Sequence, residues 1–182
     1  WGVIHNGLEL NFSAVETLIH LKENKKEFVL LTNAPRPNEP VIKFLKKMGL
    51  KENFENVFTS GEAALKYLKS DLKRKKFFHI GPPRDYDLFS SFKSFKETNI
   101  DLADYILCTG LFDNYNKDLD YYKILLKKHL KKKMICTNPD LIVDRGDVRE
   151  YCAGSVAKVF ENLKGEVIYF GKPYPPVYEL SA

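Results

Sequence analysis

The sequence has few cysteines, a single tryptophan and no long apolar run. Its 182 residues include Cys108, Cys136 and Cys152, an odd number of cysteines spread over distant positions. A disulfide framework or a zinc site would need paired or clustered cysteines, so we expect three reduced structural thiols. No apolar stretch approaches the roughly 18 residues that cross a bilayer, and no signal-peptide pattern is present. We therefore expect a cytoplasmic protein with no membrane partner.

Arginine is scarce as well, since lysines outnumber arginines 24 to 5 in a chain of net charge +5. Many of the lysines fall on the polar faces of predicted helices, which indicates a general compositional bias. No stacking-aromatic or helix-turn-helix pattern accompanies the positive charge. We therefore expect no nucleic-acid partner.

Strand and helix patterns alternate along the chain. Short apolar runs predict strands at 28–32, 56–59, 77–81, 103–108, 134–137 and 166–170. Helical periodicity lies between them at 13–24, 41–48, 60–68, 119–130 and 150–163, with Ser13 and Ser60 as predicted N-caps. Strands separated by helices predict an α/β fold with a parallel sheet. The pattern shifts near Phe77, so we expect a second α/β layer inserted into the first.

Polar residues follow two of the predicted strands. Thr32 and Asn33 end the first run, and Gly171-Lys172-Pro173 ends the last one. Open α/β sheets bind ligands at the carboxyl ends of their strands. A hydroxyl, an amide and an ammonium at such an edge could hold one phosphoryl group. Taken singly, each segment could equally be an ordinary turn.

Together with the first residues, these segments resemble a known family. In order, 1–7, 31–34 and 171–178 resemble motifs one to three of the haloacid dehalogenase-like (HAD) superfamily of hydrolases. The run 59–64 is similar to the Thr-Ser-x-x-Ala helix entry of subfamily IIA, which contains sugar-phosphate, nitrophenyl-phosphate and pyridoxal-phosphate phosphatases.

The resemblance implies a Rossmann-like core with a parallel sheet and an inserted α/β cap of the C2 type. The implied division is a first core part at 1–76, a cap at 77–164 and a second, incomplete core part at 165–182. It also implies a phosphatase of a small phosphorylated metabolite that works through an aspartyl-phosphate intermediate, with Mg²⁺ in the intact protein.

The resemblance also implies that parts of the catalytic machinery fall outside this sequence. The nucleophilic aspartate would stand two residues before Trp1 and the late acidic motif beyond Ala182, so we expect an internal piece of a longer protein. No metal ligand is expected within the chain. Trp1 itself occupies the position of the usual general-acid aspartate. His5 is the candidate acid or base in its place, although a structural histidine is the alternative reading.

The family motifs assign roles to five further residues. Lys172 would be catalytic, and Thr32 and Asn33 would bind phosphate. Asn138 and Asp140, in the turn after 134–137, would contact the substrate from the cap, although a solvated turn is equally compatible with them. Two other functions stay open: a catalytically silent fold that binds a phosphorylated ligand or a protein, and a carbon-attacking hydrolase of the dehalogenase type. A homodimer is also left open.

Overall fold

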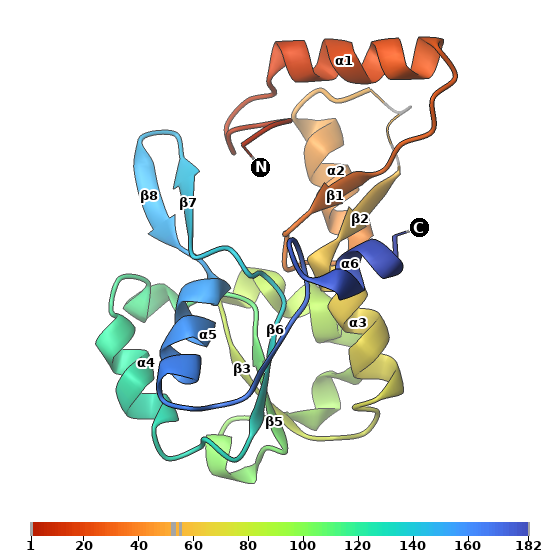
Figure 1. Cartoon of the computed structure of the whole chain (residues 1–182). Helices are drawn as coiled ribbons and strands as arrows, with labels where there is room; N and C mark the ends of the chain where they lie inside the picture. Colours follow the sequence, from red (N-terminus) through yellow and green to blue (C-terminus); the bar gives the residue numbers. More distant parts are fainter. Residues whose placement is uncertain (1, 52–53, 55, 182) are drawn as a thin grey trace.

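The structure is a computed structural model that describes residues 2–51, 54 and 56–181. It contains a two-stranded sheet with its own helices, set above a five-stranded sheet that is covered by helices on both faces (Figure 1). In both sheets all strand pairs are parallel. The predicted α/β class with parallel strands is confirmed.

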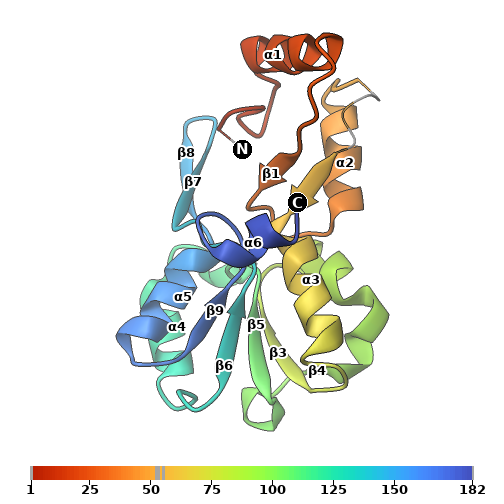
Figure 2. The same ribbon diagram turned by 45° about the vertical axis from the view of Figure 1, so that its right-hand side comes forward.

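The five-stranded sheet has the strand order β4-β3-β5-β6-β9, seen edge to edge in Figure 2. Its strands are β3 (Phe77–Ile80), β4 (Lys96–Glu97), β5 (Tyr105–Cys108), β6 (Lys133–Cys136) and β9 (Val167–Tyr169). Every residue of the central strand β5 is buried, as expected for a strand covered on both faces. Strand β9 belongs to this sheet, where Ile168 pairs with Ile135 of β6. The division into core and cap remains a prediction.

Helices cover the two faces of this sheet. On one face lie α4 (Leu119–Leu126) and α5 (Ala153–Asn162), and on the other lie α3 (Ser60–Ser70) and the 3₁₀ segment η1 (Pro83–Phe95). Neighbouring residues of β5 point to opposite faces, so Ile106 packs under α4 and α5 while Leu107 packs on the α3 side. Two short 3₁₀ turns, η2 (Ile100–Leu102) and η3 (Asp113–Tyr115), complete this part. No helix in the described residues is both long and apolar enough for a membrane span.

The smaller region consists of α1 (Phe12–Glu23), β1 (Leu30–Thr32), α2 (Asn38–Lys47) and β2 (Val57–Thr59). Its β1 residues are only half-buried, whereas β2 is buried throughout. The predicted N-cap Ser13 is wrong, because Ser13 already lies inside α1. Asn11 has the extended backbone of a cap, and its side chain accepts a hydrogen bond from the Ala14 N–H.

A β-hairpin projects from the larger region beside the N-terminal residues (Figure 1). It pairs β7 (Ile142–Arg145) with β8 (Val148–Tyr151) in antiparallel register. The helix predicted from residue 150 therefore begins too early, since α5 starts only at Ala153. The turn Gly146-Asp147, with φ +57° at the glycine, is the sequence signal for a two-residue hairpin loop. A short helix, α6 (Pro175–Glu179), lies between the two regions.

Candidate functional site

The carboxyl ends of β1, β6 and β9 meet where the two regions join. Asn33 Nδ2 donates one hydrogen bond to Asp140 Oδ1 at 2.9 Å and another to the Lys172 carbonyl oxygen at 3.0 Å. The Lys172 N–H donates to Asn33 Oδ1 at 2.6 Å. Three residues that the sequence singled out, each following a different strand, therefore form one hydrogen-bonded cluster. We call this cluster the junction.

Close backbone packing fixes the junction. Gly171 has φ +123°, and a Cβ at this residue would lie 2.6 Å from Pro139 Cδ and 2.7 Å from Asn33 Oδ1. A side chain at position 171 would therefore be both strained and obstructed. In the facing turn, Asn138 Oδ1 accepts a hydrogen bond from the Asp140 N–H at 3.0 Å, which closes the turn locally. Asn138 thus shapes the segment that presents Asp140.

Two polar groups at the junction keep hydrogen-bond donors that no other described residue accepts from. Lys172 is exposed, and within the described residues its ammonium forms no hydrogen bond or ion pair. Thr32 Oγ1 accepts a hydrogen bond from the Ala34 N–H at 3.3 Å, which leaves its own hydroxyl hydrogen to donate. Both amide hydrogens of Asn33, in contrast, are already used. Lys172 and Thr32 therefore keep donors that the described residues do not use, whereas Asn33 holds the two strand ends together.

A second contact that joins the two regions lies at the start of α3; we call it and the junction the joints between the regions. The buried Ser60 hydroxyl lies 2.9 Å from the Ala34 carbonyl oxygen and 2.5 Å from that of Thr137, so it connects the loop after β1 with the end of β6. The predicted N-cap Ser60 is wrong. Thr59 caps α3 by accepting a hydrogen bond from the Glu62 N–H at 2.9 Å. Because Thr59 does the capping, the Ser60 hydroxyl can bridge the two regions instead.

His5 is held by a different set of contacts. Its Nδ1 accepts a hydrogen bond from the Gly7 N–H at 3.0 Å, and its ring lies edge-on to Phe44 of α2 at 5.5 Å. Burial lowers the pKa of His5 to about 4, so the imidazole is neutral at pH 7 and poorly suited to donate a proton. The role predicted for it stays a prediction. Trp1 lies outside the described residues.

The residues at the junction do not fit a metal ion by themselves. Among the described residues there is no group of three His, Cys, Asp or Glu side chains that could bind one. The cysteines offer no nucleophile either. Burial raises the pKa of Cys136 and of Cys152 to about 12 and also raises the pKa of Cys108, so all three remain neutral thiols at pH 7.

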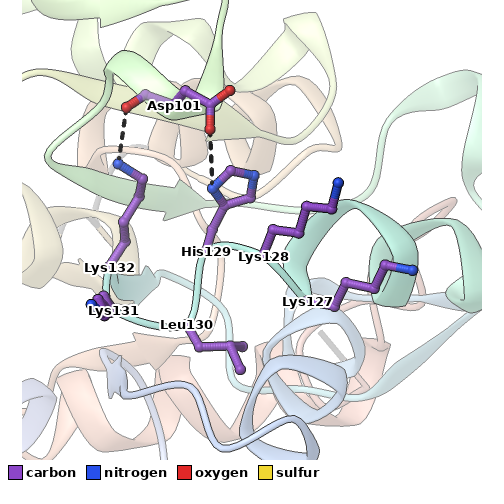
Figure 3. A pocket seen from close by; sticks show the side chains of 7 residues that line it. All are labelled: Asp101, Lys127, Lys128, His129, Leu130, Lys131 and Lys132. Carbon is purple, nitrogen blue, oxygen red and sulfur yellow. Dashed lines mark hydrogen bonds and ion pairs between the residues drawn. The ribbon is translucent and has the colours of Figure 1, made fainter.

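A cavity of about 420 Å³ lies elsewhere. It is formed by Asp101 and the turn 127–132, which precedes β6 and so lies at the opposite edge of the sheet from the junction. Figure 3 shows that its lysine side chains point apart, and that Lys132 and His129 contact Asp101. A ligand there would meet no converging set of groups, so we assign the candidate site to the junction.

Comparisons with known proteins agree on one family. A family model described as haloacid dehalogenase-like hydrolase matches residues 1–93. A solved structure from Brucella suis 1330, described as a hydrolase of the haloacid dehalogenase-like family, is 31% identical with a TM-score of 0.90, and the match covers 100% of this chain and 67% of that one. A p-nitrophenyl phosphatase from Archaeoglobus fulgidus shares the fold at 20% identity and a TM-score of 0.73, over 100% of this chain and 69% of that one.

A curated relative comes from Arabidopsis thaliana. The chloroplastic phosphoglycolate phosphatase 1A is 25% identical over 198 residues, which cover 94% of this chain and 54% of the relative. The chain thus spans about half the length of the curated relatives it matches.

Proposed function

The chain belongs to the haloacid dehalogenase-like hydrolase family, and on that premise we propose that the intact protein is a phosphatase of a small phosphorylated metabolite. The observation that carries the proposal is the junction. There the Thr32 hydroxyl and the Lys172 ammonium, which follow β1 and β9, keep hydrogen-bond donors that the described residues do not use. The names of several relatives, phosphoglycolate phosphatase and nitrophenyl phosphatase, support the same class of reaction.

Each residue of the junction receives a role in this proposal. Lys172 neutralises the charge of the phosphoryl group, and the Thr32 hydroxyl donates to one of its oxygens. Asn33 keeps the Lys172 backbone in place, because its amide is already engaged on both sides. Asp140, exposed at the tip of the facing turn, contacts the remainder of the substrate. Asn138 shapes that turn.

The chemical step itself draws on groups that the sequence predicts beyond this chain. By resemblance, an aspartate two residues before Trp1 would attack phosphorus and form an aspartyl-phosphate. Mg²⁺, which prefers carboxylate and phosphate oxygens, would by the same resemblance be bound by residues outside the chain. The cytoplasmic location and the homodimer likewise stay predictions.

The experiment is a phosphate-release assay on the intact protein with Mg²⁺. The panel should include 2-phosphoglycolate, p-nitrophenyl phosphate and several sugar phosphates. We expect at least one efficient substrate, and Lys172→Met should lower kcat/KM by about 10²–10³-fold because it removes the charge facing the phosphoryl group. Lys127→Met, another exposed lysine but on the far edge of the sheet, is the matched control and should leave kcat/KM unchanged.

A second candidate function follows from Trp1, which stands where the general acid is expected. General acid–base catalysis is typically worth about 10²–10⁴-fold, so its loss could leave a protein that binds phosphorylated ligands without cleaving them. Absence of turnover on the whole panel, together with binding of a phosphate ester that weakens in Lys172→Met, would favour this function. Halide release from haloacids without metal would instead point to the carbon-attacking hydrolase.

A further inference from the structure

Three buried polar side chains form a hydrogen-bonded chain at the carboxyl ends of β3 and β5. His79 Nε2 lies 2.8 Å from Thr109 Oγ1, and the Thr109 hydroxyl donates to Asp85 Oδ2 at 2.9 Å. The exposed fractions of the three residues are only 4%, 2% and 4%. Away from water such groups interact strongly with one another, and each must be paired to be tolerated. Loss of any hydrogen bond in this buried hydrogen-bonded chain is therefore expected to destabilise the larger region.

The hydrogen bond between His79 and Thr109 fits only because residue 81 is a glycine. A Cβ at Gly81 would lie 2.7 Å from His79 Nε2 and closer still to Thr109 Oγ1. Any side chain at position 81 would therefore push the imidazole and the hydroxyl apart. Rings of Phe89 and Tyr86, both from η1, pack against His79 at 4.9 Å and 5.5 Å and shield it.

The same 3₁₀ segment reaches the junction. Asp87, two residues after Asp85 on η1, accepts a hydrogen bond from Arg36 Nη2 at 3.0 Å. Arg36 lies in the loop that follows Asn33, so η1 contacts this loop through that ion pair. The ion pair gives the buried hydrogen-bonded chain a path of contacts to the segment that carries Thr32 and Asn33.

The two titratable ends of the chain are shifted in opposite directions. Burial raises the pKa of Asp85 to about 6, although the Thr109 hydrogen bond and two arginines partly oppose the rise. Burial also lowers the pKa of His79 to about 3. At pH 5 both groups are neutral in the folded protein, whereas in the unfolded chain the carboxyl is ionised and the imidazole is protonated. Folding at this pH moves one proton from the histidine to the aspartate.

We propose that the Thr109 hydroxyl couples the protonation of Asp85 to the tautomer of His79, and that this hydrogen-bonded chain positions η1. While Asp85 is ionised, Thr109 donates to it and accepts from His79 Nε2–H. When the carboxyl takes up a proton from solvent, it donates to Thr109, whose hydroxyl turns to donate to Nε2. The imidazole then carries its hydrogen on Nδ1, exchanged through solvent, and remains neutral. Every hydrogen bond persists in both forms.

Several other polar groups face the chain from neighbouring elements. They are Arg36 after β1, Arg84, Tyr86 and Asp87 on η1, Lys96 on β4, Cys108 on β5 and Asp113 on η3. Arginine and lysine keep their charge between pH 4.5 and 7.5, and Arg84 is paired with Asp113 at 3.2 Å. A comparison of variants with the parent protein cancels the contributions of these groups.

The test is the unfolding equilibrium constant measured in denaturant between pH 4.5 and 7.5. In the parent, the His79 contribution to stability rises with pH and the Asp85 contribution falls, so the two offset each other. Asp85→Asn removes the aspartate contribution and keeps that of the histidine. Relative to the parent, its unfolding constant should therefore fall by up to about tenfold per pH unit towards pH 6, the folded pKa of Asp85. His79→Gln leaves the aspartate alone, and its unfolding constant should rise by up to about tenfold per unit towards pH 6.

The proposal is overturned if both variants follow the pH slope of the parent. Should either variant fail to fold, NMR of ¹⁵N-labelled histidine in the parent decides the matter. We expect His79 to stay neutral down to pH 4.5 and to change from the Nε2–H to the Nδ1–H tautomer near pH 6. Gain of charge near pH 6.5, or an unchanged tautomer, would contradict the coupling between Asp85 and His79. His20, with its side chain 75% exposed, serves as the reference imidazole in the same spectrum.

The positioning role rests on the proposed function and needs a separate measurement. Thr109→Val keeps the shape of the side chain but breaks the chain of hydrogen bonds. In the intact protein it should raise KM for the best phosphate ester several-fold with little change in kcat, and more at pH 7.5 than at pH 5. An unchanged KM across pH would overturn the positioning role. Because the stability and NMR measurements need no turnover, a failure of the phosphatase proposal would leave them interpretable.

Discussion

The two parallel sheets described above have strands of similar apolar sequence, but the strands are buried to different extents. The apolar run of β5 is buried throughout and covered on both faces, whereas the apolar run of β1 is only half-buried and pairs with β2 alone. The larger region fills two apolar clusters around its sheet, one of which includes Phe58 of β2, while most of the buried apolar residues of the smaller region form a third cluster. The smaller region therefore depends on the joints that tie it to the larger one, and those joints form the candidate site.

The sharpest test of this difference compares two truncations of apolar side chains. Phe160, fully buried between α5 and the large sheet, should cost about 3–5 kcal/mol of unfolding free energy when replaced by alanine. Leu30→Ala in the half-buried β1 should cost only about 1–2 kcal/mol, because water already reaches part of the side chain. Denaturant unfolding followed by circular dichroism measures both. Equal costs would mean that the two regions are packed alike.

Ser60 offers a test of whether the stability of the smaller region depends on its contacts with the larger one. Ser60→Ala removes the hydroxyl shared by the Ala34 and Thr137 carbonyl oxygens and should cost about 1–3 kcal/mol. Hydrogen exchange should show the loss of protection mainly in β1 and β2, with little change in β5. Ser70→Ala, at the exposed end of the same helix, is the matched control and should change stability by less than about 0.5 kcal/mol. A uniform loss of protection in both sheets would contradict the joint.

The smallest expected effect lies at the edge of the smaller region. Asn11→Ala removes the side-chain cap of α1 and should cost about 0.5–1 kcal/mol, since the bond is exposed and long at 3.4 Å. Ser13→Ala should be close to neutral, because Ser13 lies inside the helix. Thermal unfolding of the two variants side by side measures the difference. A larger loss for Ser13→Ala would restore the cap predicted from the sequence.

Local patterns were enough to predict the parts of the fold that depend on neighbouring residues. The strands of the large sheet follow from their apolar runs. The meeting of Asn33 with Lys172 was expected from the rule that strand ends of one sheet share an edge, but β1 and β9 lie in different sheets, so it is the packing of the two regions that brings these residues together. The hairpin was missed because each of its strands combines two apolar and two charged residues and so forms neither an apolar run nor an alternating pattern, although the Gly146-Asp147 turn is a hairpin signal in the sequence. Thr59 took the capping role from Ser60 because both residues can cap and only tertiary contacts decide between them.

The buried chain of His79, Asp85 and Thr109 could not be predicted from spacing. Thr109 follows His79 by 30 residues, and Asp85 sits in a 13-residue 3₁₀ segment with no helical period of its own. Each of the three would be an ordinary polar residue on a surface. Only the pairing of β3 with β5 and the folding of η1 over their ends bring them into contact.

Asn33 forms hydrogen bonds with the backbone N–H and carbonyl oxygen of Lys172, whereas the Lys172 side chain takes no part in them. Position 172 is therefore a place where chemistry and architecture can be changed separately. A cysteine introduced there could carry a fluorescent or photoreactive label that reports on ligands without loosening the bond to Asn33. A substitution at Asn33 would instead alter the spacing of the two sheets. The Lys172 N–H and Asn33 Oδ1 are only 2.6 Å apart, yet changes at the two residues should have separate effects: one on ligand binding and the other on the contact between the two regions.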